Sequence, residues 1–423
     1  MKKIYLDYAA TTPVDDKVLK SMLPYFSEKF GNASSLHSFG VEASEAVEKA
    51  RVTVADFFGA ENKEEIIFTS GATESNNLAI KGVVKAYYVN PSFWTSDVQM
   101  HSGHPMSKMV KPHIITTAFE HHCVLYAVKR LEKEGLIEAT YIQPQRDGVI
   151  RAADIQKAIQ KNTVLVSVMY VNNEIGTVQP IAQIGKIIKK HNSKIQDTKY
   201  KILFHTDATQ AVSYFDCDVK KLGVDMLSMS AHKIYGPKGV GALYIKKGTP
   251  IKMIQDGGAQ ENGLRAGTIN SAGIIGLGKA IELLKTVKNK NSEIEKLRNY
   301  LIEKVLQEIP KTKLNGSRIK RSPNNANFSF SDVEGESLLI MLDAAGIAGS
   351  TGSACSSGSL APSHVLMSLG MKAEEAHGSL RLTLGKNTTK KEIDETVKQL
   401  KKIISDLRKI SGNLLGDYYK NKK

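Results

Sequence analysis

The chain is organised around Ser228-Met-Ser-Ala-His-Lys-Ile-Tyr-Gly-Pro-Lys-Gly239. The apolar residues 224–228 read as a short buried strand that leads into this stretch, and 240–245 read as a second strand that leaves it. Lys233 lies between the two in a loop rich in glycine, proline and small residues. An amine at a strand exit, flanked by His232 and Tyr235, is placed to capture a carbonyl group as a Schiff base. On this stretch alone, an ordinary solvated loop lysine is an equally good interpretation.

Composition limits the possible classes of protein. The 423 residues, 41% of them hydrophobic, suit two globular domains, or one large domain with an appendage. The net charge of +15 permits acidic partners such as tRNA or an acidic carrier protein, but the basic residues are spread along the whole chain, which favours a general lysine-rich bias. The chain has three cysteines, which are far apart and form no Cys-x-x-Cys pair. We therefore expect no disulfide framework, no metal site and a reducing compartment.

The start of the chain has no apolar signal core, and no apolar run reaches the roughly 18 residues that a membrane span needs. We therefore expect a cytoplasmic protein that does not bind a membrane. We also expect no direct binding to DNA. The stretch from Tyr88 to Pro112 has no periodicity and contains His101-Ser-Gly-His104. A surface loop between a helix and a strand is a better interpretation of it than half of a metal site.

Strand and helix patterns alternate through the first two thirds of the chain, and this predicts an α/β domain with a mostly parallel sheet. The strand patterns fall at 65–69, 114–117, 139–142, 164–169 and 202–206, and the helical patterns at 15–30, 40–59, 74–86, 124–134, 153–160 and 181–190. After a helical stretch over 274–308, a smaller α+β domain is expected from a strand at 326–331 and helices at 335–345, 362–369 and 391–411.

Polar side chains follow several of these strands. Gly71, Ala72 and Thr73 lie where a strand turns into a helix, so they could bind an anion, although plain helix capping explains them as well. Asp207 ends another apolar strand, where a carboxylate can either hold the protonated pyridine nitrogen of pyridoxal phosphate (PLP) or cap the next turn. His121 could stack on a flat ring or move protons.

The amides of Val171-Asn-Asn-Glu174 follow a further strand and are good donors to a phenolic oxygen. Each of these clusters alone is more often structural. Together with Lys233 they favour a PLP-type site, because ligands of α/β proteins bind at the carboxyl ends of the strands.

Two features lie in the last quarter of the chain. Cys355 is surrounded by small residues over 349–359, so we expect a mobile loop that delivers a nucleophilic thiolate, although a linker with an incidental cysteine has the same composition. Arg381 stands in a strand-like run, where its guanidinium could bind a carboxylate or be a strand-end surface charge.

These motifs resemble the cysteine desulfurases of the IscS/NifS type, which are PLP enzymes with the aspartate aminotransferase-like fold. The resemblance runs nearly end to end. It is most specific at Ser70-Gly-Ala-Thr-Glu-Ser75, Val171-Asn-Asn-Glu-Ile-Gly176, Asp207-Ala-Thr-Gln210, His232-Lys-Ile-Tyr-Gly-Pro-Lys-Gly239 and Gly352-Ser-Ala-Cys355. It implies a large domain over 15–285 with a mostly parallel seven-stranded sheet, and a smaller α+β domain over 1–14 and 286–423 that carries the cysteine loop.

The resemblance also implies roles. Lys233 would hold PLP and move the substrate α-proton, Cys355 would take the sulfur of L-cysteine as a persulfide, and His121 would stack on the cofactor ring. The remaining roles are phosphate binding by Ala72, Thr73, Ser230 and His232, pairing of Asp207 with the pyridine nitrogen, contact of Gln210 and Asn173 with the ring oxygen, and binding of the substrate carboxylate by Arg381 with Asn173.

Thr268 would reach the phosphate of a partner subunit, which implies a homodimer. The sulfur would pass to an acceptor such as an iron–sulfur scaffold or a tRNA-thiolation protein. A selenocysteine lyase-like or aminotransferase-like enzyme, or a partner-dependent sulfur carrier, are the alternatives; the long cysteine loop disfavours the first two.

Overall fold

The computed structural model describes residues 3–89, 110–195, 201–289, 291–351 and 362–420. Its centre is a seven-stranded sheet in the order β2-β8-β7-β6-β5-β3-β4. Only β8 runs antiparallel to its neighbours, so the mostly parallel sheet that the alternating pattern predicts is confirmed. The strands are β2 (Ile66–Thr69), β3 (His113–Thr117), β4 (Glu138–Ile142), β5 (Thr163–Ser167), β6 (Leu203–Asp207), β7 (Met226–Ser230) and β8 (Gly241–Ile245).

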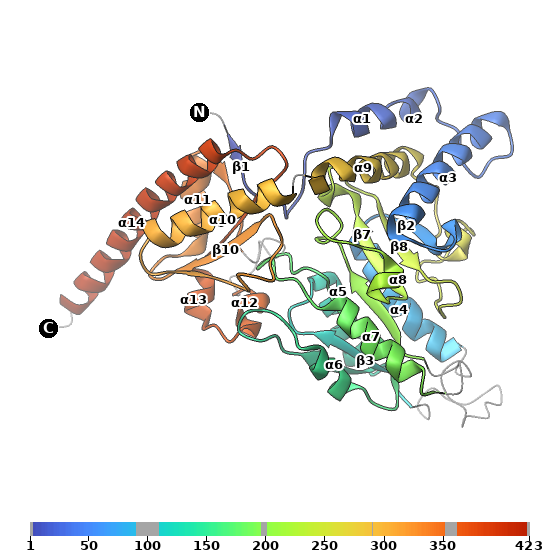
Figure 1. The fold of residues 1–423 in the computed structure, drawn as a ribbon, viewed down its shortest axis with the longest axis horizontal. Helices are drawn as coiled ribbons and strands as arrows, with labels where there is room; N and C mark the ends of the chain where they lie inside the picture. The colour runs from blue at the N-terminus through green and yellow to red at the C-terminus, as the bar shows by residue number, and fades with distance from the viewer. Residues whose placement is uncertain (1–2, 90–109, 196–200, 290, 352–361, 421–423) are drawn as a thin grey trace.

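Helices cover both faces of this sheet (Figure 1). On one face, apolar residues of α3, α6, α7 and α9 share a core with the sheet, and on the other face α4 and α5 do so. Burial of these apolar surfaces is the main favourable term that holds the three layers together. The helices are α3 (Ser38–Phe58), α4 (Ala72–Val89), α5 (His122–Lys133), α6 (Ala152–Ala158), α7 (Ile181–Asn192), α8 (Val219–Leu222) and α9 (Ser271–Asn289).

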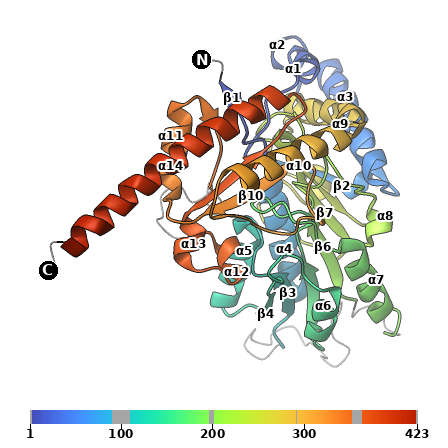
Figure 2. The same ribbon diagram turned by 60° about the vertical axis from the view of Figure 1, so that its left-hand side comes forward.

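A second group of elements forms its own core beside the large sheet (Figures 1 and 2). It holds the antiparallel sheet β12-β10-β9 and the parallel pair β1-β11, which brings the N-terminal strand into this group. Its elements are β1 (Ile4–Tyr5), α10 (Asn291–Glu308), β9 (Thr312–Leu314), β10 (Asn325–Phe330), α11 (Gly335–Ala344), β11 (Ile347–Ala348), β12 (Ser379–Thr383) and α14 (Lys390–Lys420).

The structure differs from the sequence prediction in several elements. The helix expected over 15–30 is two helices, α1 (Asp16–Met22) and α2 (Pro24–Ser27), because Pro24 has no N–H to continue the first one. The helix expected over 362–369 is the shorter α12 (His364–Ser368), which is followed by α13 (Ala373–His377). The strands β9 and β11 are too short to give a sequence pattern.

The second group has a core of its own, and the domain boundaries expected at residues 14 and 285 stay a prediction. Most of the Tyr88–Pro112 stretch, including His101 and His104, lies outside the described residues. Within the parts of the chain that the structure describes, none of the helices combines the length and the apolar character required to cross a membrane.

Candidate active site

The candidate active site lies at one edge of the large sheet. Strands β2, β3, β5, β6 and β7 run in the same direction, so their carboxyl ends meet at this edge. The loops that follow these ends, together with residues 9–11, line a cavity of about 520 Å³. The lining brings together ten residues that the sequence singled out: Ala72, Thr73, His121, Asn173, Asp207, Gln210, Ser230, His232, Lys233 and Arg381.

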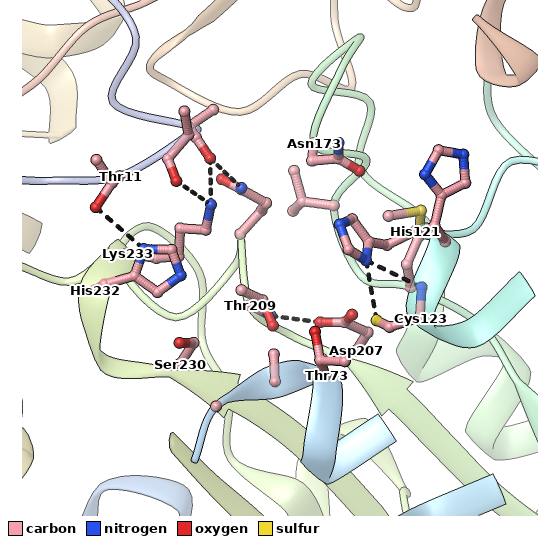
Figure 3. Close-up of a pocket in the computed structure, with 18 of the residues that line it drawn as sticks. Thr11, Thr73, His121, Cys123, Asn173, Asp207, Thr209, Ser230, His232 and Lys233 are labelled. Atoms are coloured by element: carbon pink, nitrogen blue, oxygen red, sulfur yellow. Dashed lines mark hydrogen bonds between the residues drawn. The ribbon is translucent and has the colours of Figure 1, made fainter. Parts of the chain in front are cut away.

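Lys233 is held by the N-terminal segment. It ends the 3-10 turn Ala231–Lys233, which follows β7 directly. Its Nζ donates hydrogen bonds to the backbone oxygens of Ala9 (2.6 Å) and Ala10 (2.7 Å), as Figure 3 shows. The same segment is fixed to the lysine loop because the Thr12 hydroxyl donates to the backbone oxygen of His232. The amine therefore stands at a defined place on the cavity wall.

Asp207 forms the floor of the cavity (Figure 3). Its Oδ1 accepts a hydrogen bond from the Thr209 backbone N–H (2.9 Å), and its Oδ2 accepts one from Asn76 Nδ2 (2.7 Å). Behind it His205 bridges two serine hydroxyls, and burial lowers the pKa of His205 to about 4, so this imidazole is neutral. Asp207 is thus a fixed carboxylate with a neutral residue behind it.

His121 lies on another side of the cavity, immediately before α5. Its Nδ1 accepts a hydrogen bond from the backbone N–H of Cys123 (3.3 Å) and lies 2.9 Å from Cys123 Sγ. Burial lowers the pKa of His121, so its ring is neutral near pH 7. Its neighbour His122 stacks on Tyr126 at 4.7 Å between ring centroids and packs against His364.

An anion could be held between the start of α4 and the end of β7. Gly71 has a φ of +149°, which residues with a Cβ rarely adopt, so glycine allows the tight turn that brings the backbone close to Ser230. The first N–H groups of α4, at Ala72 and Thr73, point out of the helix start, where its dipole favours negative charge. Burial lowers the pKa of His232 to about 4, which leaves this ring as a neutral hydrogen-bonding group.

Arg381 enters the cavity from β12. Its Nη2 donates to Asp7 Oδ1 (2.8 Å) and its Nη1 donates to the backbone oxygen of Asn173 (2.9 Å). Among the described residues, neither Arg381 Nε nor Asn173 Oδ1 has a hydrogen-bond partner, although both atoms are buried. Buried polar atoms without partners are costly, so the donor Arg381 Nε is suited to a carboxylate of a ligand, whereas the acceptor Asn173 Oδ1 needs a donor.

The sequence analysis assigned no role to three buried side chains near the cavity, the carboxyl groups of Glu120 and Glu174 and the amide of Asn76. Burial raises the pKa of Glu120 to about 8 and that of Glu174 to about 7, and Glu174 accepts a hydrogen bond from Ser363. Asn76 holds Asp207, as described above. Its place one turn inside the helix that starts at Ala72 was the only signal in the sequence. Cys123 lies two residues after His121, but the sequence gave no sign that it faces the cavity.

The structure leaves two candidate residues without a place in the described cavity wall, for different reasons. Thr268 is exposed and is absent from the lining of this cavity, whereas its segment is tied to the large sheet by the ion pair of Arg51 and Glu261. Cys355 lies outside the described residues.

Comparison with known proteins identifies the family. The aminotransferase class-V family model matches residues 4–112 and 107–396. A cysteine desulfurase IscS of Clostridium botulinum (strain Hall) is 49% identical over all of this chain and 99% of its own length. The chain belongs to the cysteine desulfurases of the class-V aminotransferase family.

Further relatives agree with this assignment. A cysteine desulfurase IscS of Dictyoglomus turgidum is 50% identical over 97% of this chain and 96% of its own length. The solved structure of a NifS-like protein superposes with a TM-score of 0.83 at 35% identity, covering 95% of this chain and 99% of the other. A structure described as SspA in complex with cysteine has a TM-score of 0.74 at 36% identity, covering 90% and 98%. Members of this family depend on PLP.

Proposed function

We propose that the chain is a PLP-dependent cysteine desulfurase that takes the sulfur of L-cysteine onto Cys355 as a persulfide and releases L-alanine. The observation that carries this proposal is the convergence of the Lys233 amine, the Asp207 carboxylate and the Arg381 guanidinium on one cavity. An amine can capture an aldehyde, and a fixed carboxylate can pair with a protonated pyridine. The full-length relatives that bear this name support the same activity.

The residues present fit PLP. The cavity offers an anion site at Gly71 and the start of α4, a carboxylate at its floor, and polar atoms such as Thr209 Oγ1 and Asn173 Oδ1 that have no partner within the described residues. In our assignment Ala72, Thr73, Ser230 and His232 hold the phosphate together with Thr268 of a second copy, Asp207 pairs with the pyridine nitrogen, Gln210 and Asn173 contact the ring oxygen, and His121 covers the ring.

Gln210 already donates from Nε2 to the backbone oxygen of Ala9 (2.9 Å), the same oxygen that accepts from Lys233. The Gln210 amide nitrogen carries a second N–H, so it can donate to the ring oxygen while it keeps this contact. We expect the two side chains to respond together, because they use one acceptor.

When bound, PLP supplies an electron sink that stabilises negative charge at the substrate α-carbon. Lys233 would be the base that takes the α-proton of the substrate. Arg381 and Asn173 hold the substrate carboxylate: Arg381 Nε is a buried donor without a partner within the described structure, and Asn173 can donate to the carboxylate only through its amide nitrogen Nδ2. This fixes which face of the substrate is turned to the Lys233 amine.

The sulfur step belongs to Cys355. Its thiolate attacks the sulfur of the substrate, an S–S bond forms, and the bond between that sulfur and the substrate carbon breaks. The electron pair of the broken bond stays with the carbon fragment, which takes up protons and leaves as alanine. The persulfide sulfur then passes to an acceptor protein, for which an iron–sulfur scaffold and a tRNA-thiolation enzyme are the candidates.

A homodimer is part of this proposal. Several large apolar side chains between α1 and α3 are exposed, among them Phe26, Phe30, Leu36 and Phe39, and Leu36 is 97% exposed. The rings of Phe30 and Phe39 lie 5.7 Å apart, so these side chains form a joint patch. Patches of this kind mark interaction sites, and a second copy would cover it while supplying Thr268.

The test uses purified full-length protein. We expect a yellow protein that releases alanine and, with a thiol reductant, sulfide from L-cysteine in equal amounts. Cys355→Ala should keep the colour and lose sulfide release, whereas Cys217→Ala, which alters a buried cysteine away from the cavity, should keep both. Lys233→Ala should lose covalently bound PLP.

Three results would contradict the proposal. Full sulfide release by Cys355→Ala would rule out the persulfide step, and covalent PLP in Lys233→Ala would rule out the assigned amine. Transfer of an amino group to a keto acid without sulfide release would favour an aminotransferase-like enzyme instead.

A further inference from the structure

Cys123 lies between Asp207 and His121, two residues of the candidate active site that follow different strands. Its Sγ lies 2.9 Å from His121 Nδ1 and 3.1 Å from Asn76 Nδ2. The same Asn76 nitrogen donates to Asp207 Oδ2 at 2.7 Å. A continuous line of hydrogen bonds therefore runs from the carboxylate at the cavity floor to the histidine at its side, and Figure 3 shows Cys123 between the two.

The direction of these hydrogen bonds follows from the groups that can only donate. The backbone N–H of Cys123 can only donate, and it points at His121 Nδ1 at 3.3 Å, so Nδ1 is an acceptor. The amide nitrogen of Asn76 can only donate, so Sγ accepts from it. The Thr73 hydroxyl also hydrogen-bonds to the thiol and can act as a further donor to Sγ. The thiol proton is then directed to His121 Nδ1, and the neutral imidazole carries its own proton on Nε2.

The charge states agree with this direction. Burial, reinforced by the negative charge of Asp207, raises the pKa of the Cys123 thiol to about 12, so the thiol keeps its proton. Burial lowers the pKa of His121 most, Lys233 and His122 lower it further, and Asp207 opposes them.

Other titratable groups also face this corner. His364 packs on His122 from α12, and Glu120, the residue before His121, lies near the thiol. Both histidine neighbours have lowered pKa values because of burial, so they are neutral near pH 7. The corner therefore holds a neutral thiol beside a neutral imidazole.

We propose that Cys123 is a positioning residue that fixes His121 in the Nε2–H tautomer and sets the orientation of its ring. Figure 3 shows the other ring nitrogen of His121 on the side away from Cys123, toward the space between Asn173 and Lys233. Cys123 thus makes His121 a hydrogen-bond donor to whatever occupies the cavity. Its meaning for catalysis rests on the proposed function, but the tautomer is a property of the chain itself.

The test compares Cys123→Ala, which removes the thiol donor, with Cys123→Ser, which keeps a hydroxyl donor. Both are made in the full-length protein with ¹⁵N-labelled histidine, and His121→Gln identifies the His121 signal. In the unaltered protein we expect a pyridine-type shift for Nδ1 and a pyrrole-type shift for Nε2. In Cys123→Ala only the longer contact from the backbone N–H of residue 123 (3.3 Å) remains at Nδ1. We therefore expect a shift of the tautomer population toward Nδ1–H and a rise of about 0.5 to 1 pH unit in the midpoint of the His121 titration, because the shorter donor to the neutral ring is lost.

Cys123→Ser should restore the single tautomer, and Cys217→Ala should leave the His121 signals unchanged. Unaltered His121 shifts and midpoint in Cys123→Ala would overturn the proposal, as would a Cys123→Ser protein that behaves like Cys123→Ala. If the alanine variant does not fold, Cys123→Val, which fills the space of the thiol without a donor, takes its place with the same expected and contradicting results.

The acid limb of the pH profile of kcat/KM for sulfide release should move in the same direction as the His121 midpoint. A protein without desulfurase activity would defeat the proposed function but not this one, because the tautomer is read from the histidine itself.

Discussion

Replacement of Arg381 by lysine tests how the cavity binds the carboxylate of its substrate. Arg381 commits one terminal nitrogen to Asp7 and the other to the backbone oxygen of Asn173. These contacts hold the guanidinium plane, and Nε is left buried without a partner within the described residues. Lysine keeps the positive charge, but its single nitrogen cannot hold both anchors and bind a carboxylate as the planar fork does.

The expected effect follows from the loss of one charge-assisted hydrogen bond to the carboxylate. Such a bond contributes about 1.5–3 kcal/mol, which corresponds to a rise in KM for cysteine of roughly 10- to 150-fold. The carboxylate is bound in the ground state and in the transition state alike, so kcat should change much less than KM. Arg381→Ala is a poorer test, because removing one partner of a buried ion pair costs about 3–5 kcal/mol of stability.

The assay is sulfide release over a range of cysteine concentrations, with yellow colour and thermal unfolding as checks on the fold. Arg130→Lys is the matched control, because Arg130 lies on the surface in an ion pair with Glu134. A folded, coloured Arg381→Lys protein with an unchanged KM would refute the assignment of Arg381 to the substrate carboxylate. A fall in kcat at constant KM would place Arg381 in the chemical step instead.

Three further predictions concern other buried charges. Asp207→Asn should keep the fold but lower kcat at least about a hundredfold, since a preorganised charge partner is removed; kinetics and colour check this. Glu174 has a pKa raised from 4.5 to about 7, so the native state holds its proton more tightly and loses stability as pH rises from about 4.5 to about 7. Glu174→Gln should therefore raise the free energy of unfolding by roughly 3 kcal/mol at pH 8 and leave it nearly unchanged at pH 5, which urea unfolding at the two pH values would show. Glu261→Ala breaks the buried, two-pronged ion pair with Arg51 and should lower the free energy of unfolding by about 3–5 kcal/mol, whereas Glu48→Ala, which removes a half-exposed partner of the same arginine, should cost about 1 kcal/mol or less.

Much of the site could be predicted from the sequence because strand exits are local features. Asp207 ends its strand, His121 and Lys233 follow soon after the strands that end at residues 117 and 230, and parallel strands bring their carboxyl ends to one edge. Gly71 likewise indicates the turn before α4, because a glycine between a strand pattern and a helix pattern is a local feature of the sequence. Ten candidate residues therefore meet in one cavity although up to about 300 positions separate them along the chain.

Pro24 indicates the break between α1 and α2, but the sequence analysis missed it because the helical spacing of apolar residues continues across the proline. The short strands β9 and β11 could not be found, since pairing with β10 and β1 defines them and not their own composition. The domain boundaries, the roles of the individual site residues and the cytoplasmic location stay predictions.

The sequence by itself determined the family, the alternation of strands and helices in the large sheet, and the lysine at the centre of Ser228–Gly239, because these depend on residue types within a few positions of one another. Only the tertiary structure placed residues 9 and 10 over Lys233, Asp7 beside Arg381, and Asn76 and Cys123 between Asp207 and His121. These contacts join segments up to 374 residues apart. Their hydrogen bonds exist only once packing has brought the partners together and excluded the water that would otherwise satisfy them.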